Sequence, residues 1–454
     1  MIYYGNETRR AIENFNLGPE TVNPSLIQAI VLVKKACCLA NIEAGLLERE
    51  KGDWILAACD TVLSPEFQKE LAKQFPSHPL QGGAGTSTNM NVNEVLAGLA
   101  LTQQGFGSDS YHLLHPLDHV NLSQSTNDVY PTALRVAAIY KLRRLSEVIA
   151  DLQEALQEKE KEFSDVLKLG RTQLMDALPI TLGQSFGAFA RAVSRDRWRI
   201  YKAEERLREV NLGGTAIGTG LNASQSYIYR VTEALQRITG LGLARSEYPI
   251  DTTQNADVFV EVSGLLKASA TTLLKISSDL RLMNSGPKGG LSEITLPERQ
   301  AGSTMMPGKV NPVMAEMMGT IAMKVMANDS AITLAAASGQ LELNAFLPLI
   351  AHSLLDSLDL MISGVDLFTR YAIEGIRANT EKCSEHLNQS TALVTALAHH
   401  IGYDQAALLA TEMLETGLSL EHLVVSRGIM DAAHFRQIVT PHEITSPGIP
   451  GTRK

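Results

Sequence analysis

The stretch that decides the fold runs from Leu142 to Phe163 and reads LRRLSEVIADLQEALQEKEKEF. Its apolar residues recur at spacings of three, four and seven, and most positions between them are charged or carry an amide. This spacing places the apolar side chains in one stripe along a helix. The stretch therefore predicts a long amphipathic helix that buries one face.

The same apolar stripe returns in residues 258–283, 314–332 and 347–368, with Ser269 as the one break in the first of these. A shorter helix is predicted over residues 25–47 by the same spacing. Strand-like alternation is scarce, and Gly and Pro cluster between the long helical stretches. The pattern predicts a mainly α protein whose centre is a bundle of long helices.

A chain of 454 residues is too long for a single hydrophobic core. We expect three domains: a mixed, mostly helical N-terminal domain (1–128), a central long-helix bundle (129–382) and a small helical C-terminal domain (383–454). Helices of this length commonly bury their stripes against other subunits, so the pattern favours an oligomer.

The composition excludes several classes of function. A formal net charge of −9 disfavours binding to nucleic acid. The four cysteines show no zinc-ligand spacing, so free thiols in a reducing cytosol, with no metal and no cofactor, are expected. No signal core and no run of about eighteen apolar residues is visible, which predicts a cytoplasmic protein without a membrane segment.

Four polar segments rich in hydroxyl and amide side chains adjoin the predicted helices. They are GTSTN (85–89), SQSTND (123–128), GRTQ (170–173) and GSTMMPGKVNP (302–312). Together they suit a carboxylate ligand, because their groups donate many hydrogen bonds without a strong positive field. Taken singly, each of the first three is better explained as a helix cap or a turn. On that interpretation Thr172 caps a helix beginning at Asp176.

These segments resemble the signature blocks of the fumarase/aspartase superfamily. Residues 302–312 are similar to its GSSxMPxKxN block, with Thr304 at the second serine. Further similar blocks are QGGAGTSTNMNVN (81–93), HVNLSQSTNDVYP (119–131), GRTQLMDALPITLGQ (170–184) and NLGGTAIGTGLN (211–222). The resemblance covers essentially the whole chain. It implies a three-domain fold and a homotetramer with a twenty-helix central bundle, in which three subunits build each active site.

The family resemblance also implies a role for each matching residue. The reaction is an elimination from a succinyl substrate, and Ser303 matches the general base. The residues implied to bind the substrate are Thr86, Ser125, Thr126 and the Thr304 amide around the aci-carboxylate, Thr172, Lys309 and Asn311 at the other carboxylate, Asn127 at the leaving group, and Gln173 beside it. Gly302 and Gly308 are the expected hinges of a loop that closes over the substrate.

Gln173 decides which bond is cleaved. Hydratases of the family carry His there, paired with an acid at the position of Glu316, because hydroxide is a poor leaving group and water has a pKa of about 15.7. An ammonium group leaves already protonated, and Gln173 cannot donate a catalytic proton. The resemblance therefore implies deamination of L-aspartate to fumarate and ammonia.

Three alternatives stay open. The first is fumarate hydration, and the second is a lyase for a substituted aspartate, since Thr304 and Met175 depart from the family pattern. The third is a catalytically silent structural protein, against which the presence of Ser303, Lys309 and Asn311 argues. A further open point is the segment HPLDH (115–119), which is similar to a second dicarboxylate site of fumarases, or is a loop whose histidines cap or pack.

Overall fold

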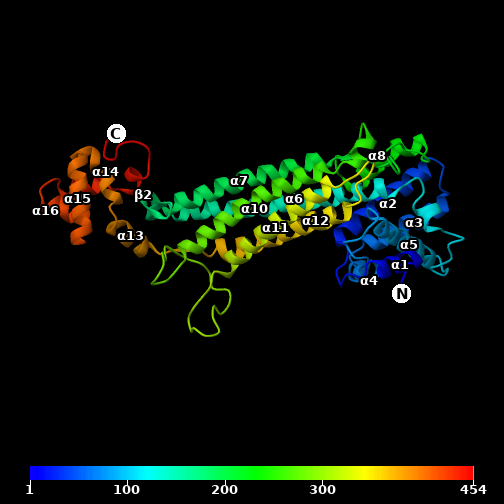
Figure 1. Ribbon diagram of the computed structural model, residues 1–454, viewed down its shortest axis with the longest axis horizontal. Helices are drawn as coiled ribbons and strands as arrows, with labels where there is room; N and C mark the ends of the chain where they lie inside the picture. Colours follow the sequence, from blue (N-terminus) through cyan, green and yellow to red (C-terminus); the bar gives the residue numbers. More distant parts are fainter. Residues whose placement is uncertain (453–454) are drawn as a thin grey trace. The chain divides into compact units, whose positions relative to one another are not determined.

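The structure is a computed structural model that describes residues 1–452. It is mainly helical, as predicted, and its few strands form two-stranded sheets (Figure 1). The shorter helices before the bundle are α1 (Asn6–Asn14), α2 (Pro24–Glu43), α3 (Arg49–Leu63), η1 (Phe67–Glu70), α4 (Leu71–Gln74), α5 (Thr86–Gln103) and η2 (Pro116–Val120). The helices of the C-terminal part are η3 (Thr369–Ile373), α13 (Thr380–Gln389), α14 (Ala392–Ile401), α15 (Tyr403–Thr416), α16 (Leu420–Ser426), α17 (Ala432–Ile438) and α18 (Pro441–Ile444).

The long helices follow the apolar stripes of the sequence. They are α6 (Thr126–Glu162), α7 (Leu182–Leu207), α10 (Asp257–Met283), α11 (Val313–Ala337) and α12 (Leu347–Phe368), with the shorter α8 (Gln225–Thr239) and α9 (Pro249–Gln254) between them. The stripe residues of α6, from Leu142 to Phe163, are buried. The prediction of long helices in these stretches is confirmed. Of the five long helices, α7 alone was not predicted as a separate helix.

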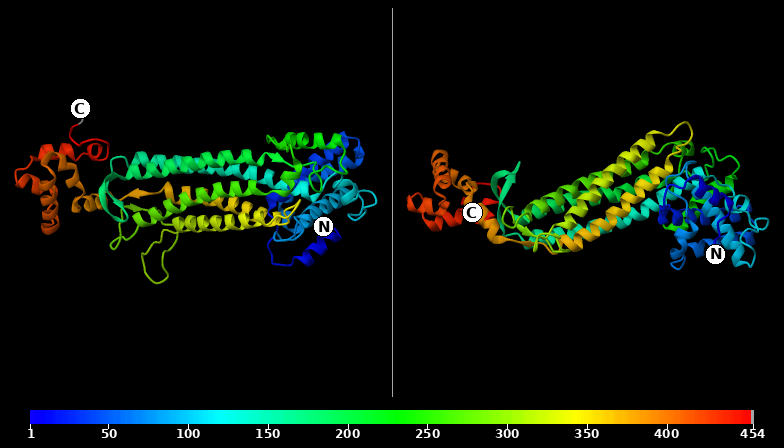
Figure 2. Two further views of the ribbon diagram at one scale, coloured as in Figure 1. Left: turned by 45° about the horizontal axis from the view of Figure 1, so that its top comes forward. Right: turned by 60° about the horizontal axis from the view of Figure 1, so that its bottom comes forward.

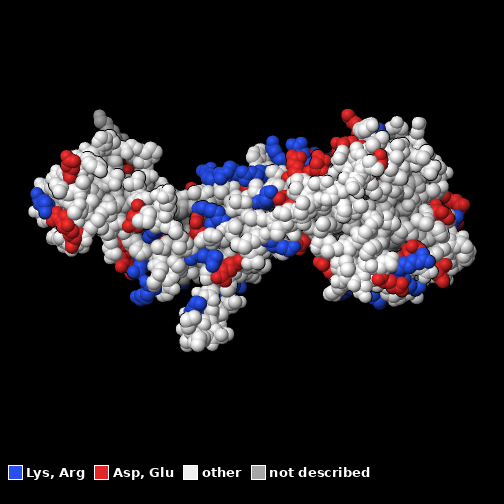
Figure 3. Space-filling view, in the orientation of Figure 1, with Lys and Arg blue, Asp and Glu red and all other residues white. Residues whose placement is uncertain are grey.

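Helix α7 differs from its neighbours in its exposed side. That side carries the exposed basic residues Arg191 and Arg195 and the stacked rings of Trp198 and Tyr201. In Figure 3, Lys and Arg side chains gather along the upper edge of the molecule, where Figure 1 labels α7. The buried side of α7 is nevertheless a regular apolar stripe, which includes Phe186, Val193 and Ile200 and is broken at Asp196, so the sequence did carry the periodic signal for this helix.

The described residues form two compact units. Unit 1 consists of Met1–Glu147, Trp198–Ala270 and Ala322–Ile362, and unit 2 consists of Val148–Arg197, Thr271–Ile321 and the described residues from 363 to 452. Each unit contains segments of the long helices, which run side by side in both views of Figure 2. The division into three domains by chain order stays a prediction.

In unit 1, helix α2 packs against α3, α5 and α8. By length and apolar composition alone, α2 would be long enough to cross a membrane, but 67% of its most apolar window is buried inside the protein. Lys34 lies within that helix and is also fully buried. The short strands β3 (Glu209–Val210) and β4 (Ala244–Arg245) pair in parallel in this unit. We interpret α2 as a core helix.

Unit 2 contains an antiparallel hairpin of β1 (Leu167–Thr172) and β2 (Met175–Thr181). Strand β5 (Ile294–Thr295) pairs with β6 (Arg377–Ala378). Helices α13 to α18 pack around a small apolar core that includes Leu397, Leu409 and Ile438, and strand β1 adds Leu169 to it. Across the described chain all four cysteines are free and buried, as predicted.

Candidate active site

Thr86 is the first residue of α5, and a left-handed turn leads into it. Gly83, Ala84 and Gly85 have φ values of 82°, 54° and 93°. A Cβ on Gly85 would lie 2.4 Å from the ring of Tyr130, so only glycine allows α5 to begin against α6. The Thr86 hydroxyl donates to the Gly83 carbonyl at 2.8 Å. Thr86 is exposed at the positive end of the α5 dipole, a position that suits a carboxylate.

The segment from Ser125 to Asn127 starts α6. The Ser125 hydroxyl accepts a hydrogen bond from the Asn127 amide at 3.2 Å, so the predicted helix cap is confirmed. The Thr126 hydroxyl accepts from Asn89 Nδ2 at 3.1 Å. Asn89 follows Thr86 by three residues on α5, which places Thr86 and Thr126 on neighbouring surfaces of the two helices. The Asn127 side chain donates to the Ala216 carbonyl at 2.7 Å.

The buried carboxylate of Asp128 holds the backbone of residues 125–127 in place. The sequence pattern did not single out this residue. Its Oδ1 accepts from the Ser125 amide at 3.0 Å, and its Oδ2 accepts from the amides of Gly213 and Thr215, each at 3.1 Å. Burial raises the pKa of the Asp128 carboxyl to about 6, against the lowering effect of these amide donors. One carboxylate thus joins the start of α6 to the glycine-rich loop at residues 211–222.

Lys34 is a second buried charge beneath the segment. Its Nζ donates to Asn121 Oδ1 at 2.8 Å and to Gln124 Oε1 at 2.9 Å. Burial lowers the pKa of Lys34 to about 8. Asn121 Oδ1 also accepts from the side-chain amides of Asn89 and Asn93. The sequence signal that could have identified Lys34 is a lysine among the apolar residues of the α2 stripe, where a charged side chain is unusual.

Thr172 and Gln173 lie at the tip of the β1–β2 hairpin in unit 2. Thr172 pairs with Met175, and the two residues between them, Gln173 and Leu174, have φ values of 54° and 65°. A two-residue turn with both φ values positive matches the twist of a hairpin, although Gly or Asn usually occupies it. The interpretation of Thr172 as the cap of a helix beginning at Asp176 was wrong, because Asp176 lies in β2.

Residues 302–311 form a loop whose two ends lie against each other, with Gly302 next to the backbone of Lys309. A Cβ on Gly302 would lie 2.0 Å from the Lys309 carbonyl oxygen, so the close approach requires glycine there. The Asn311 side chain donates to the Gly302 carbonyl, and Gly308 has a φ of 78°. Asn311 therefore closes the base of the loop, while Lys309 is exposed.

The Ser303 hydroxyl oxygen accepts two backbone hydrogen bonds within this loop. The donors are the amides of Met305, at 3.1 Å, and Met306, at 2.9 Å. Two N–H groups aimed at one hydroxyl oxygen favour its ionised form. Thr304, which follows Ser303, is exposed.

The predicted site residues thus fall into two sets. Unit 1 contains Thr86, Ser125, Thr126 and Asn127, which hydrogen bonds and close packing join around the start of α6. Unit 2 contains Thr172, Gln173, Ser303, Thr304, Lys309 and Asn311, on a hairpin and a loop.

The histidines of residues 115–119 act as caps. The Nδ1 atom of His115 accepts from the amides of Leu117 and Asp118, and the Nδ1 atom of His119 accepts from the His115 amide at 2.7 Å. Burial, followed by the charge of Lys51, lowers the pKa of His119. Within residues 1–452 no group of three or more His, Cys, Asp or Glu side chains is arranged to hold a metal ion.

The fold and the polar segments are those of a lyase, and the chain belongs to that family. The family described as "Lyase" matches residues 2–327, and "Fumarase C C-terminus" matches residues 393–446. The resemblance to the fumarase/aspartase superfamily is thereby confirmed.

The relatives define the branch of the family more narrowly. An aspartate ammonia-lyase of a Bacillus species is 44% identical over 99% of this chain and 96% of its own. An enzyme of the same name from Helicobacter pylori is 42% identical over 98% of this chain and 95% of its own. A solved structure described as fumarate lyase:delta crystallin from Brucella melitensis, bound to cobalt, superposes with a TM-score of 0.94 at 42% identity, covering 98% and 96% of the two chains. A class II fumarase from Schistosoma mansoni superposes with a TM-score of 0.90 at 32% identity, covering 98% and 95%.

Proposed function

We propose that this chain is an aspartate ammonia-lyase, which converts L-aspartate reversibly to fumarate and ammonia. The observation that carries the proposal is its similarity, over nearly the whole of both chains, to relatives of that name. Gln173 at the hairpin tip agrees with it, because no side-chain acid is needed when the leaving group is already an ammonium.

Ser303 is the proposed general base. Its alkoxide removes a proton from the carbon next to one carboxylate, and the electron pair moves into that carboxylate to give the aci-carboxylate dianion. The Met305 and Met306 amides, at 3.1 and 2.9 Å from Ser303 Oγ, support the alkoxide before the transfer. Preorganised donors to the charge that develops on the aci-carboxylate usually make the largest contribution in such chemistry. The proposed donors to the aci-carboxylate are Thr86, Ser125, Thr126 and the Thr304 amide.

The second step breaks the carbon–nitrogen bond. The dianion collapses to the unsaturated product, and the bonding electrons leave with nitrogen as neutral ammonia. In this proposal Asn127 contacts the amino group, and Thr172, Lys309 and Asn311 hold the carboxylate that does not take up charge. Lys309 is the cation of this set, which suits a permanently anionic group.

We also propose a cytoplasmic homotetramer whose active sites are each built from three subunits. The exposure of large apolar side chains beside the site residues supports assembly. Leu174 is 74% exposed, Met175 is 71% exposed and Met305 is 87% exposed. Apolar side chains gathered at a functional segment commonly mark a surface that another chain covers.

The test is to follow the ultraviolet absorbance of fumarate with purified protein, with and without ammonium. Loss of absorbance that requires ammonium and yields L-aspartate supports the proposal. Formation of malate at a high rate without ammonium would show a hydratase instead. A panel of substituted amines in place of ammonium tests the remaining alternative, a lyase for a substituted aspartate, which the departures at Thr304 and Met175 leave open.

A further inference from the structure

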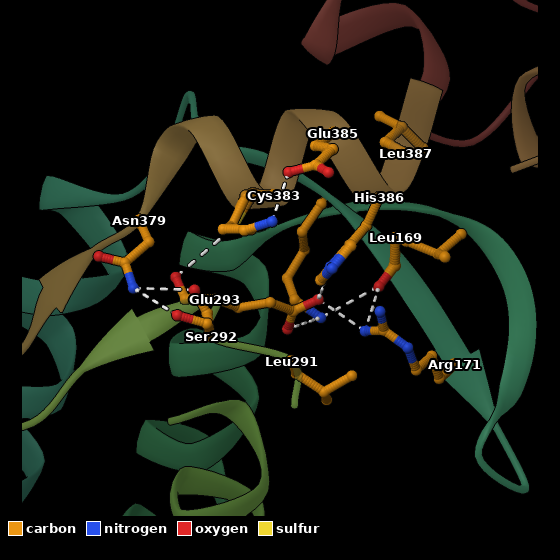
Figure 4. Close-up of polar contacts among 12 residues, drawn as sticks. Leu169, Arg171, Leu291, Ser292, Glu293, Asn379, Cys383, Glu385, His386 and Leu387 are labelled. Atoms are coloured by element: carbon orange, nitrogen blue, oxygen red, sulfur yellow. Dashed lines mark hydrogen bonds and ion pairs between the residues drawn. The ribbon is translucent and has the colours of Figure 1, made fainter. Parts of the chain in front are cut away.

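Unit 2 contains a carboxylate, that of Glu293, whose side chain is fully buried beside the β1–β2 hairpin (Figure 4). Its Oε1 accepts a hydrogen bond from Arg171 Nη1 at 2.6 Å, and its Oε2 lies 2.9 Å from Lys168 Nζ. His386 of α13 lies 3.8 Å from Oε1 through Nδ1. We call Lys168, Arg171, Glu293 and His386 the Glu293 cluster.

An irregularity in β1 allows both cations to reach the same carboxylate. Side chains of a regular strand alternate between its faces, so residues 168 and 171 would lie on opposite faces. The pairing of β1 with β2 shifts between Leu169 and Arg171, at Gly170. A Cβ on Gly170 would lie 2.4 Å from the Leu178 carbonyl oxygen, so glycine is required at this bulge. The bulge turns Arg171 toward the side of the strand that Lys168 occupies.

The backbone of Glu293 is itself held from two other elements. Its amide donates to the Met283 carbonyl at the end of α10 at 2.8 Å, and its carbonyl accepts from the Asn379 amide at 2.9 Å. Asn379 also donates from its side chain to the Ser292 carbonyl at 2.8 Å, as Figure 4 shows. These hydrogen bonds fix the position of Glu293. Its carboxylate in turn holds the β1–β2 hairpin through Lys168 and Arg171.

Stability alone is a weak reason for such a cluster. Removing a carboxylate from water costs several kcal/mol, and well-packed apolar residues often replace a buried ion pair without loss of stability. What the cluster does fix is geometry, because Arg171 directly precedes Thr172. On a strand the side chain after Arg171 points to the other face, and Thr172 is indeed exposed.

We propose that Glu293 is a positioning residue, which holds Arg171 and thereby sets the place of Thr172 and Gln173 at the substrate. The inference rests on the proposed function, in which Thr172 contacts a substrate carboxylate. Glu293 acts through Arg171 and does not touch the substrate. A carboxylate anchor contributes equally to ground state and transition state, so its displacement raises KM more than it lowers kcat.

The test compares Glu293→Gln with wild type in KM and kcat for L-aspartate and in amide hydrogen exchange at residues 171–175. We expect KM to rise about tenfold while kcat changes less than about threefold, and hairpin exchange to quicken about tenfold. The matched control is Glu421→Gln, which breaks a 2.9 Å ion pair to Arg436 on the exposed surface of the same unit. It should change none of these quantities.

Arg171→Gln provides a second route, because it removes the link and leaves Glu293 paired with Lys168. It should raise KM as Glu293→Gln does, and Lys168→Gln should raise it less. The proposal would be overturned if KM and hairpin hydrogen exchange were unchanged in both Glu293→Gln and Arg171→Gln. It would also be overturned if both variants failed to fold. Wild-type protein that does not turn over aspartate would refute the proposed function, whereas hairpin exchange still tests the positioning.

Discussion

Replacing Asp128 with asparagine tests the buried carboxylate beneath the predicted substrate segment. Asparagine keeps the size of the side chain and removes its charge. The pKa of the Asp128 carboxyl rises from 3.8 to about 6 on folding, mainly because burial disfavours the charged form. That difference corresponds to about 3 kcal/mol of differential interaction between the two protonation states.

The sign follows from proton counts. Between pH 3.8 and about 6 the folded protein holds more of this proton than the unfolded chain, so wild-type stability falls as pH rises through this window. Asparagine has no such proton and resembles the protonated acid. We expect the free energy of unfolding of Asp128→Asn, relative to wild type, to improve by about 2 kcal/mol from pH 4 to pH 7, because at pH 4 the unfolded carboxyl is already partly ionised.

A second effect acts in the opposite direction and does not depend on pH above 6. The carboxylate accepts amide hydrogen bonds through both oxygens, whereas asparagine has only one oxygen. At least one buried amide then loses its acceptor, at a cost of about 1 to 3 kcal/mol. The change with pH, rather than the value at any one pH, therefore isolates the charge.

The assay is urea denaturation at fixed protein concentration from pH 4 to pH 7, with Asp151→Asn as the control. Asp151 lies on the same helix, α6, and is exposed. The control should follow wild type at every pH. A difference between Asp128→Asn and wild type that stays constant over this range would refute the account of Asp128 as a destabilising buried charge.

Three further predictions follow from the site. Ser303→Ala should lower kcat by about 10²- to 10⁴-fold, as loss of a general base does, and change stability by less than about 1 kcal/mol, because the substitution removes one hydroxyl group from a loop and leaves no cavity in the core. Ser278→Ala, at an exposed serine of α10, should leave both quantities unchanged in the same kinetic and denaturation assays. Gly85→Ala should destabilise the protein by at least about 2 kcal/mol in thermal unfolding, because its Cβ would lie 2.4 Å from the Tyr130 ring at a φ of 93°, and an unchanged melting temperature would contradict this packing. Lys34→Met should abolish a rise in wild-type stability above pH 8: the pKa of Lys34 falls from 10.5 to about 8 on folding, so the unfolded chain holds more protons in this window, and titrating stability from pH 7 to pH 10 measures the effect.

The helices were predictable because their information is repeated along the chain. In α6, α10 and α12 each apolar residue adds to the same periodic pattern, and the observed bounds of α12, Leu347–Phe368, coincide with the predicted ones. The cap at Ser125 was predictable for a similar reason, since the residue types at the start of a helix follow local hydrogen bonding.

The hairpin and the buried charges were not predictable in this way. The two turn positions are occupied by Gln173 and Leu174 rather than by the Gly or Asn that marks a tight hairpin turn. The residues of β1 and β2 were therefore interpreted as a cap followed by a helix. Asp128 contacts amides 85 and 87 residues away, at Gly213 and Thr215. Contacts over such distances leave no periodic trace in a single sequence.

Three buried carboxylates connect distant parts of the chain, and this bears on how the predicted site is held. Glu94 of α5 accepts from the amides of Gly5, Glu7 and Thr8, Asp128 accepts from three amides, and Glu293 contacts two cations. Each joins segments distant in sequence and lies on, or is bonded to, an element that carries a predicted site residue. Removing a carboxylate from water costs several kcal/mol even where it is paired, so these residues are poor means of gaining stability. Their common effect is to fix backbone positions, which is what preorganised donors to a developing dianion require.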